Sequence, residues 1–184
     1  MFLPFCFGRC IIPNYCDNEL YIKGSISLRL DFVEVAKTED RILDFNSFVP
    51  YPEEWREGDK IYNEWWEKYH SLLSDEKDVF ALFTPEPKNY YSDFGYDWCY
   101  KFWNSKWNSL ESRVDHNNRR TLFYFDTAWS PPKAVILKMS EMFPDLNFKL
   151  KYWECGAGFK GAYECENGII VQDESSNYRG NRGG

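Results

Sequence analysis

The sequence predicts an α+β domain in which helices pack on one antiparallel sheet, and three observations predict it. Residues 122–125 are apolar or aromatic on both sides of a two-residue period, which is typical of a strand covered on both faces. A helical pattern follows and ends at Pro144, and residues 146–152 then alternate strictly between apolar and polar side chains. Because the order strand, helix, strand also occurs near the start of the chain, we expect two such units in one sheet.

The first unit begins with a short strand at residues 19–23, which Gly24 ends. Leu28, Phe32, Val35 and Ala36 then recur at helical spacing, which favours a helix over residues 25–38. The sequence ILDFNSFV, which follows at positions 42–49, predicts a second strand or an extended edge segment.

The second unit follows the strand at 122–125 with a helix that starts at Pro131, where a missing N–H costs nothing, and that Ser130 can cap. The strand at 146–152 comes next. A Gly-Ala-Gly turn leads to another alternating strand at 159–165, and Asn167-Gly168 is a hairpin signal before a last apolar segment. The helix should pack on the sheet through one apolar face, formed by Val135, Ile136, Met139, Met142 and Phe143.

This order of elements predicts a ferredoxin-like βαββαβ sandwich with a C-terminal β-hairpin extension and a large, partly helical insertion between the second and third strands. A chain of 184 residues has room for one domain with a real core. We therefore expect a single domain over residues 1–173 with an insertion at 51–118. Residues 174–184 are polar and Gly-rich at their end, and we expect a flexible tail there.

The insertion carries a helical pattern that Asp59 can cap, followed by a shorter apolar segment at 79–83. Its aromatic residues fall on one face of the expected helix and include Tyr62, Trp65, Trp66 and Tyr69. A two-layer sandwich covers one sheet face with its own helices. We therefore expect the inserted helix to cover the other face.

The insertion is also strongly acidic, because residues 53–78 hold nine Asp or Glu against four Lys or Arg. A solvated helix face is one explanation, and a surface for a basic partner is the other. The candidate partner-binding residues are Glu53, Glu54, Glu57, Glu64 and Glu67.

The formal net charge of −7 argues against direct binding of nucleic acid and against binding to anionic membranes. No run of 18 apolar residues and no signal peptide is present, so we expect a cytoplasmic protein of a bacterial host. We expect the six cysteines to be reduced, and the spacing of Cys6, Cys10 and Cys16 is a poor match to a zinc site. No metal and no cofactor is predicted.

Four blocks of the sequence resemble the YubB and Api92-like family: IPNYCDNELYIKG near the start, DWCYKFWNSKWNS from Asp97, FDTAWSPP from Phe125, and FPDLNFKLKYWECGAGFKG from Phe143. The resemblance covers about residues 12–168. It implies a ferredoxin-like domain carried by phages, plasmids and genomic islands, and it implies no known activity. Asn104 and Cys155 stand where the family pattern has Gly and Pro.

No catalytic residue is predicted, since neither His70 nor His116 lies in a spacing typical of a metal pair or of a base beside a nucleophile. The residues that match the family blocks form either a structural knot of Trp N–H groups, Lys and carboxylates, or an aromatic-walled pocket. This candidate pocket comprises Trp98, Trp103, Lys106, Trp107, Asp126, Trp129, Glu154 and Phe159.

Two hypotheses for function follow. The first is a non-enzymatic accessory protein of a phage or plasmid that binds and inhibits a host protein, for instance a nucleic-acid-processing or defence complex, by presenting negative charge as DNA does. The second is a small-ligand or nucleotide binder that uses the aromatic pocket. A third, binding of single-stranded RNA on the open sheet face, is disfavoured by the net acidity.

Overall fold

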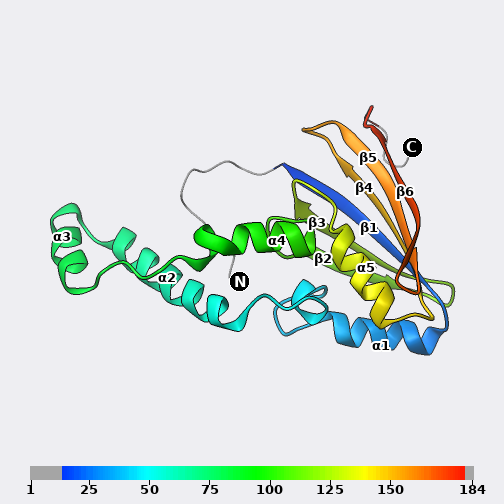
Figure 1. The fold of residues 1–184 in the computed structure, drawn as a ribbon, viewed down its shortest axis with the longest axis horizontal. Helices are drawn as coiled ribbons and strands as arrows, with labels where there is room; N and C mark the ends of the chain where they lie inside the picture. Colours follow the sequence, from blue (N-terminus) through cyan, green and yellow to red (C-terminus); the bar gives the residue numbers. More distant parts are fainter. Residues whose placement is uncertain (1–13, 181–184) are drawn as a thin grey trace. The chain divides into compact units, whose positions relative to one another are not determined.

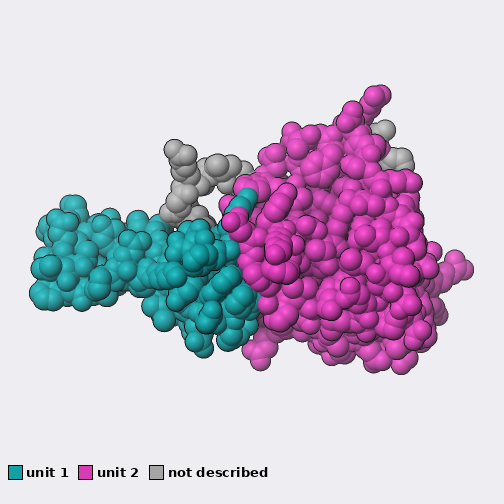
Figure 2. All heavy atoms as spheres, viewed as in Figure 1, with its two compact units in different colours: residues 1–10, 51–96 teal, residues 11–50, 97–184 magenta. Residues whose placement is uncertain are grey.

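The structure, a computed structural model, describes residues 14–180 of the chain. These residues form two compact units (Figure 2). Residues 51–96 are called here the insertion unit, and residues 14–50 with 97–180 the sheet unit. Among the buried apolar side chains of residues 14–180, Tyr51 alone belongs to the insertion unit. The hydrophobic core therefore lies in the sheet unit.

The sheet unit is built on a six-stranded sheet in which all neighbouring strands are antiparallel (Figure 1). The spatial order is β2-β3-β1-β4-β5-β6. The first four strands thus have the arrangement of a ferredoxin-like βαββαβ sandwich, and the last two extend it as a hairpin beyond β4. The strands are β1 (Tyr15–Lys23), β2 (Leu110–His116), β3 (Thr121–Ala128), β4 (Asn147–Glu154), β5 (Phe159–Glu166) and β6 (Ile169–Asn177).

Two helices, α1 (Ile26–Ala36) and α5 (Lys133–Met142), cover the same face of this sheet (Figure 1). Alternate residues of β1 from Cys16 to Ile22 point to that face and are buried, while the residues between them are half-buried. Phe32 of α1 joins the layers, because its ring contacts Phe123 of β3 and Phe148 of β4 at centroid distances of 5.9 and 5.3 Å. The predicted fold class and the central position of the strands at 19–23 and 122–125 are confirmed.

The second strand lies in a different segment from the one predicted. Residues 42–49 form no strand and contain a short 3₁₀ helix, η1 (Phe45–Ser47). The second strand is β2, which begins at Leu110 inside the expected connection of 51–118. The helical insertion therefore precedes the second strand instead of following it.

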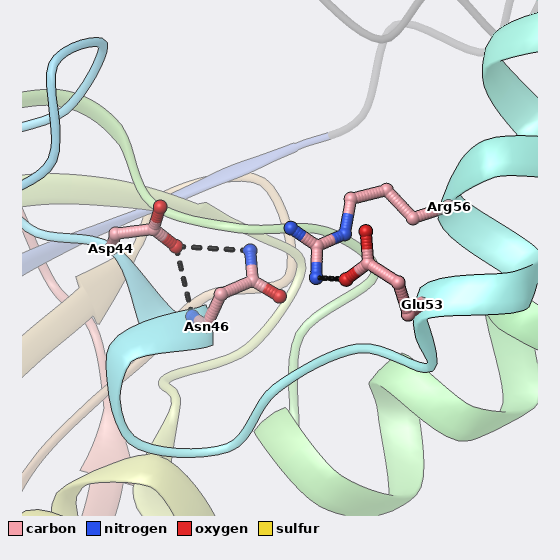
Figure 3. Close-up of polar contacts among 4 residues, drawn as sticks. All are labelled: Asp44, Asn46, Glu53 and Arg56. Carbon is pink, nitrogen blue, oxygen red and sulfur yellow. Dashed lines mark hydrogen bonds and ion pairs between the residues drawn. The ribbon is translucent and has the colours of Figure 1, made fainter.

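The physical reason for this difference is that β2 is an edge strand with one neighbour, β3, so its sequence LESRVDH has no buried stripe that would mark it. In residues 42–49, Leu43, Phe45 and Phe48 are buried without belonging to a strand. Asp44 Oδ1 accepts hydrogen bonds from the N and Nδ2 atoms of Asn46 at 2.8 and 3.0 Å (Figure 3), and from Asn108 Nδ2 at 2.7 Å. Backbone N–H groups of this segment therefore donate to side chains and not to a neighbouring strand.

The start of α5 also differs from the prediction, because Ser130 does not cap it. The helix begins at Lys133, after two buried prolines. An N–H group in its first turn is capped by a side chain from another segment, because Ala134 N donates to Asn104 Oδ1 at 2.8 Å. Ser130 Oγ instead donates to Asn104 O at 2.5 Å. Asn104 has a φ of 56°, a conformation that Asn tolerates better than most residues.

Two further expectations are corrected. Strand β6 continues to Asn177, so residues 174–177 belong to the sheet and not to a flexible tail. The inserted helix α2 (Glu53–Ser71) has no buried residue, whereas rings packed on a sheet face would be buried, so its aromatic stripe is not the expected cover layer. On the sheet face away from the helices, β1 and β4 present charged residues such as Glu19 and Lys151, which are half-buried.

Candidate functional site

The insertion unit begins with α2, whose glutamates all point to solvent. Pro52 precedes the helix, and Glu53 and Glu54 occupy its first turn, where the helix dipole favours negative charge. Glu53 forms an ion pair with Arg56 one turn later (Figure 3). The five predicted partner-binding residues are all exposed: Glu53, Glu54, Glu57, Glu64 and Glu67.

The charge of the chain is concentrated in this unit. Residues 51–96 contain eleven Asp or Glu and five Lys or Arg, a net charge of −6, out of −7 for the whole chain. The acidic side chains of α2 are therefore surrounded by an excess of the same sign, and the unit has a strongly negative potential.

The aromatic stripe of α2 packs on the next helix, α3 (Ser74–Phe83). Trp65 stacks on Tyr69 at a centroid distance of 5.1 Å and lies 6.2 Å from Phe80 of α3. Trp65 Nε1 donates to Thr84 O at 2.7 Å, which fixes the end of α3. Lys77 of α3 lies over the Tyr69 ring at 5.4 Å. The partner of the predicted stripe is thus α3, and the two helices form a hairpin.

The first half of α2 packs on the segment that returns from α3, residues 90–95. Asp59 accepts hydrogen bonds from Tyr51 Oη at 2.9 Å and from Tyr91 N at 2.7 Å, so it lies inside the helix and does not cap it as predicted. Burial raises the pKa of this carboxyl above its usual value. A Cβ on Gly58 would lie 2.4 Å from the Tyr90 ring. A side chain at position 58 would therefore displace the Tyr90 ring.

The candidate pocket residues occur in four places. Lys106, Trp107 and Trp129 come together where the loop after α4 (Tyr96–Trp103) meets the end of β3. Lys106 Nζ lies over both indole rings, 4.8 Å from the Trp107 centroid and 4.9 Å from the Trp129 centroid. The ammonium therefore makes cation–π contacts with both rings. Trp107 Nε1 is buried without an acceptor among the described residues.

Trp98 and Trp103 belong to α4 and contribute to packing. Trp103 is 4% exposed, lies edge-on to Phe45 at 5.9 Å, and donates from Nε1 to Val49 O at 2.9 Å. Trp98 contacts Trp103 edge-on at 5.3 Å. The contacts of Trp98 and Trp103 therefore fit the structural alternative for these residues and not a pocket.

Glu154 and Phe159 flank the turn between β4 and β5. Glu154 is 2% exposed, and its carboxylate accepts hydrogen bonds from the backbone N–H groups of Gly156, at 2.7 Å, and of Ala157. Phe159 lies edge-on to Tyr152 at 6.1 Å. The charge of Glu154 is thus used to hold the turn.

Asp126 lies on the opposite sheet face from Glu154. In the register, Cys16 pairs with both Thr127 and Glu154, so these three point to the helices, while Asp126 pairs with Asp17 on the open face. Burial raises the pKa of the Cys16 thiol, and the charges of Asp17, Glu154 and Asp126 raise it further. The structure therefore separates the two predicted carboxylates by the thickness of the sheet.

Sequence reasoning missed two features. The first is Arg29, a fully buried arginine whose guanidinium bonds to backbone carbonyl oxygens of the β2–β3 turn, and no spacing in the sequence indicates it. The second is a shallow groove of about 670 Å³ over β4, β5 and β6. Its lining includes Lys151, Trp153 and Lys160, and none of the predicted pocket residues.

Comparison with known proteins identifies the C-terminal part of the chain. Residues 102–180 match the family model described as the ferredoxin-like domain in Api92-like protein. This part of the chain is therefore similar to the Api92-like family. A crystal structure of the protein api92 from Yersinia pseudotuberculosis is similar in fold, with a TM-score of 0.50 and 11% sequence identity over 92% of this chain and 99% of that chain. No curated protein matches the chain.

The matched residues contain the Lys106 loop and the Glu154 turn, while the insertion unit lies before them. His70 stacks on Trp66 at 3.7 Å, and His116 Nδ1 lies 2.6 Å from Thr121 Oγ1. Within residues 14–180 no cluster of His, Cys, Asp and Glu has the arrangement of a metal site. The same residues include no helix long and apolar enough to cross a bilayer. Cys6 and Cys10 lie outside the described residues.

Proposed function

We propose that this chain is a non-enzymatic, cytoplasmic accessory protein of a phage or plasmid, and that it binds and inhibits a host protein through the insertion unit. The observation that carries the proposal is the concentration of a net charge of −6 in residues 51–96, on a unit that contributes almost nothing to the hydrophobic core. If the acidic residues served only to solvate a helix face, the charge would not have to be concentrated in a unit separate from the hydrophobic core. Exposed carboxylates on a separate unit are suited to contact a partner.

The chemistry of α2 favours a partner with a basic surface. Carboxylates spaced along a helix oppose Lys and Arg side chains as the phosphates of DNA do. A groove that binds nucleic acid has such side chains, so a nucleic-acid-processing or defence protein of the host is the proposed target. Occupation of the groove by α2 would exclude the nucleic acid, and no catalytic step by this chain is needed.

The experiment that tests this proposal reverses the charge of α2 and measures binding to the partner by a quantitative pull-down followed by calorimetry. Because exposed charges attract a basic surface, the reversed variant should lose binding, and raising the salt concentration should weaken the wild-type complex, as charges are screened beyond roughly 8 Å at physiological ionic strength. The variant carries Lys at positions now occupied by Glu53, Glu54, Glu57, Glu64 and Glu67.

A matched control makes the same change of total charge in the sheet unit. Its five exposed acidic residues, replaced by Lys, are Asp31, Glu39, Asp40, Asp115 and Asp145. Binding should survive in the control. If charge reversal on α2 leaves binding intact while Lys106→Ala or Glu154→Gln abolishes it in a folded protein, the charge hypothesis is wrong and the ligand-pocket hypothesis replaces it.

A further inference from the structure

Helix α3 presents an apolar face that no other described part of the chain covers. Val79, Leu82 and Phe83 are 57%, 77% and 79% exposed, and they lie at positions i, i+3 and i+4, so they form one stripe. Leu73, just before the helix, is 69% exposed. Side chains of this size at this exposure are uncommon in such a cluster unless they contact a partner.

The face of α3 next to the stripe already has a partner in α2. Phe80 contacts Trp65 and Tyr69 of α2 at 6.2 and 6.5 Å, and Lys77 lies over Tyr69. Lys77 lies on the far side of the helix from Val79 and Leu82, and Phe80, three residues before Phe83, lies between the two faces. The helix is therefore held by α2 in a way that leaves the stripe directed outward.

Charge decides what the stripe can dock against. Asp75 and Glu76 lie one turn before Val79 on the same side of the helix, and both are exposed. A second copy of this chain would bring two insertion units of charge −6 together, which like-charge repulsion opposes. A partner with basic residues beside an apolar surface is complementary to the whole face.

We propose that α3 is the anchoring helix of the complex and that it inserts Val79, Leu82 and Phe83 into an apolar groove of the partner bordered by Lys and Arg side chains. This is the helix-in-groove mode of recognition, in which residues at i, i+3 and i+4 fill successive pockets. The proposal rests on the proposed function, since it names the anchor of the same unit. The carboxylates of α2 then guide association, and the apolar side chains of α3 hold the complex.

The first experiment finds the partner with the full chain in the cells that carry its gene. A benzophenone amino acid replaces Leu82 or Phe83, and in a control it replaces Ile61, an exposed apolar residue of α2 with 57% exposure. We expect cross-links from positions 82 and 83 to one protein, at residues of an apolar groove flanked by Lys or Arg. Cross-links to a second copy of the chain, or none from either position, would overturn the proposal.

The second experiment measures the kinetics of the purified complex. The double variant Leu82→Ser with Phe83→Ser should lower the affinity by about 30-fold or more, as loss of interface hot spots does, with most of the change in the dissociation rate. Charge reversal on α2 should change mainly the association rate and its salt dependence. The control Ile61→Ser should have little effect, and circular dichroism should show that each variant is folded.

The two proposals fail in different ways. If charge reversal abolishes binding and the Leu82, Phe83 double variant binds as the wild type does, the anchoring role of α3 is excluded and the proposed function stands. If neither change affects the complex, both are excluded. Weaker binding of the double variant with an unchanged dissociation rate would also contradict the anchoring role of α3.

Discussion

Single buried polar residues in the sheet unit hold turns by bonding to backbone groups. Arg29 Nε donates to Gly24 O at 3.2 Å, and its Nη1 and Nη2 donate to Asn117 O at 2.9 Å and Asn118 O at 3.0 Å. Glu154 uses its carboxylate in the same way at the β4–β5 turn. Because these charges are satisfied by fixed backbone dipoles, both residues have structural roles that explain their burial without a ligand.

At this scale we predict that Arg29→Lys destabilises the protein. A lysine presents one point charge in place of the planar fork that reaches three carbonyl oxygens on two sides, so at least one of them loses its donor. The expected cost is about 2 to 4 kcal/mol, that of one or two hydrogen bonds to a charged group. Urea unfolding measures it, with the exposed Arg119→Lys as control. Equal stability of the two variants would contradict the structural role.

Helices of similar aromatic content have different surroundings in this chain. Trp103 of α4 is 4% exposed and bonded to the backbone, whereas α2 contains no buried residue and Trp66 stacks on His70 at its surface. The aromatic stripe of α2 thus stabilises the α2–α3 hairpin and not the core of the sheet unit. Aromatic content alone does not distinguish these two uses of a ring.

The prediction for these elements compares two substitutions of the same residue type. Trp103→Ala should cost about 3 to 5 kcal/mol of the free energy of unfolding, as removal of a fully buried ring does. Trp66→Ala should cost less than half as much, because its ring is already partly in water. Thermal and urea denaturation followed by circular dichroism give both values. A larger loss for Trp66→Ala would show that α2 is part of the main core.

The whole chain separates its hydrophobic core from its charge. Nearly every buried apolar side chain of the described residues lies in the sheet unit, while residues 51–96 carry −6 of the −7 net charge. Repulsion among these carboxylates does not act within the core, and a polar surface of this kind costs the fold little stability.

We therefore predict that the sheet unit folds without the insertion unit. Replacement of residues 51–96 by a Gly/Ser linker of about eight residues should leave the sheet intact. Trp103, at the end of α4, donates from Nε1 to Val49 O at 2.9 Å, so the linker has to cover only about the length of α4. Amide-proton NMR dispersion and the thermal midpoint measure the outcome. The deletion variant should be less acidic and should not bind the partner. An unfolded deletion variant would contradict the prediction.

The ferredoxin-like frame could be predicted from local periodicity, because β1, β3 and β4 are central strands and α5 has a single apolar face. The sequence also located the acidic segment. The position of the second strand depends on its pairing with β3, because an edge strand such as Leu110–His116 has no buried stripe in its sequence. The partners of Trp65 and of Asn104, and the separation of Asp126 from Glu154 by the sheet, likewise depend on contacts between distant segments, which no local pattern specifies.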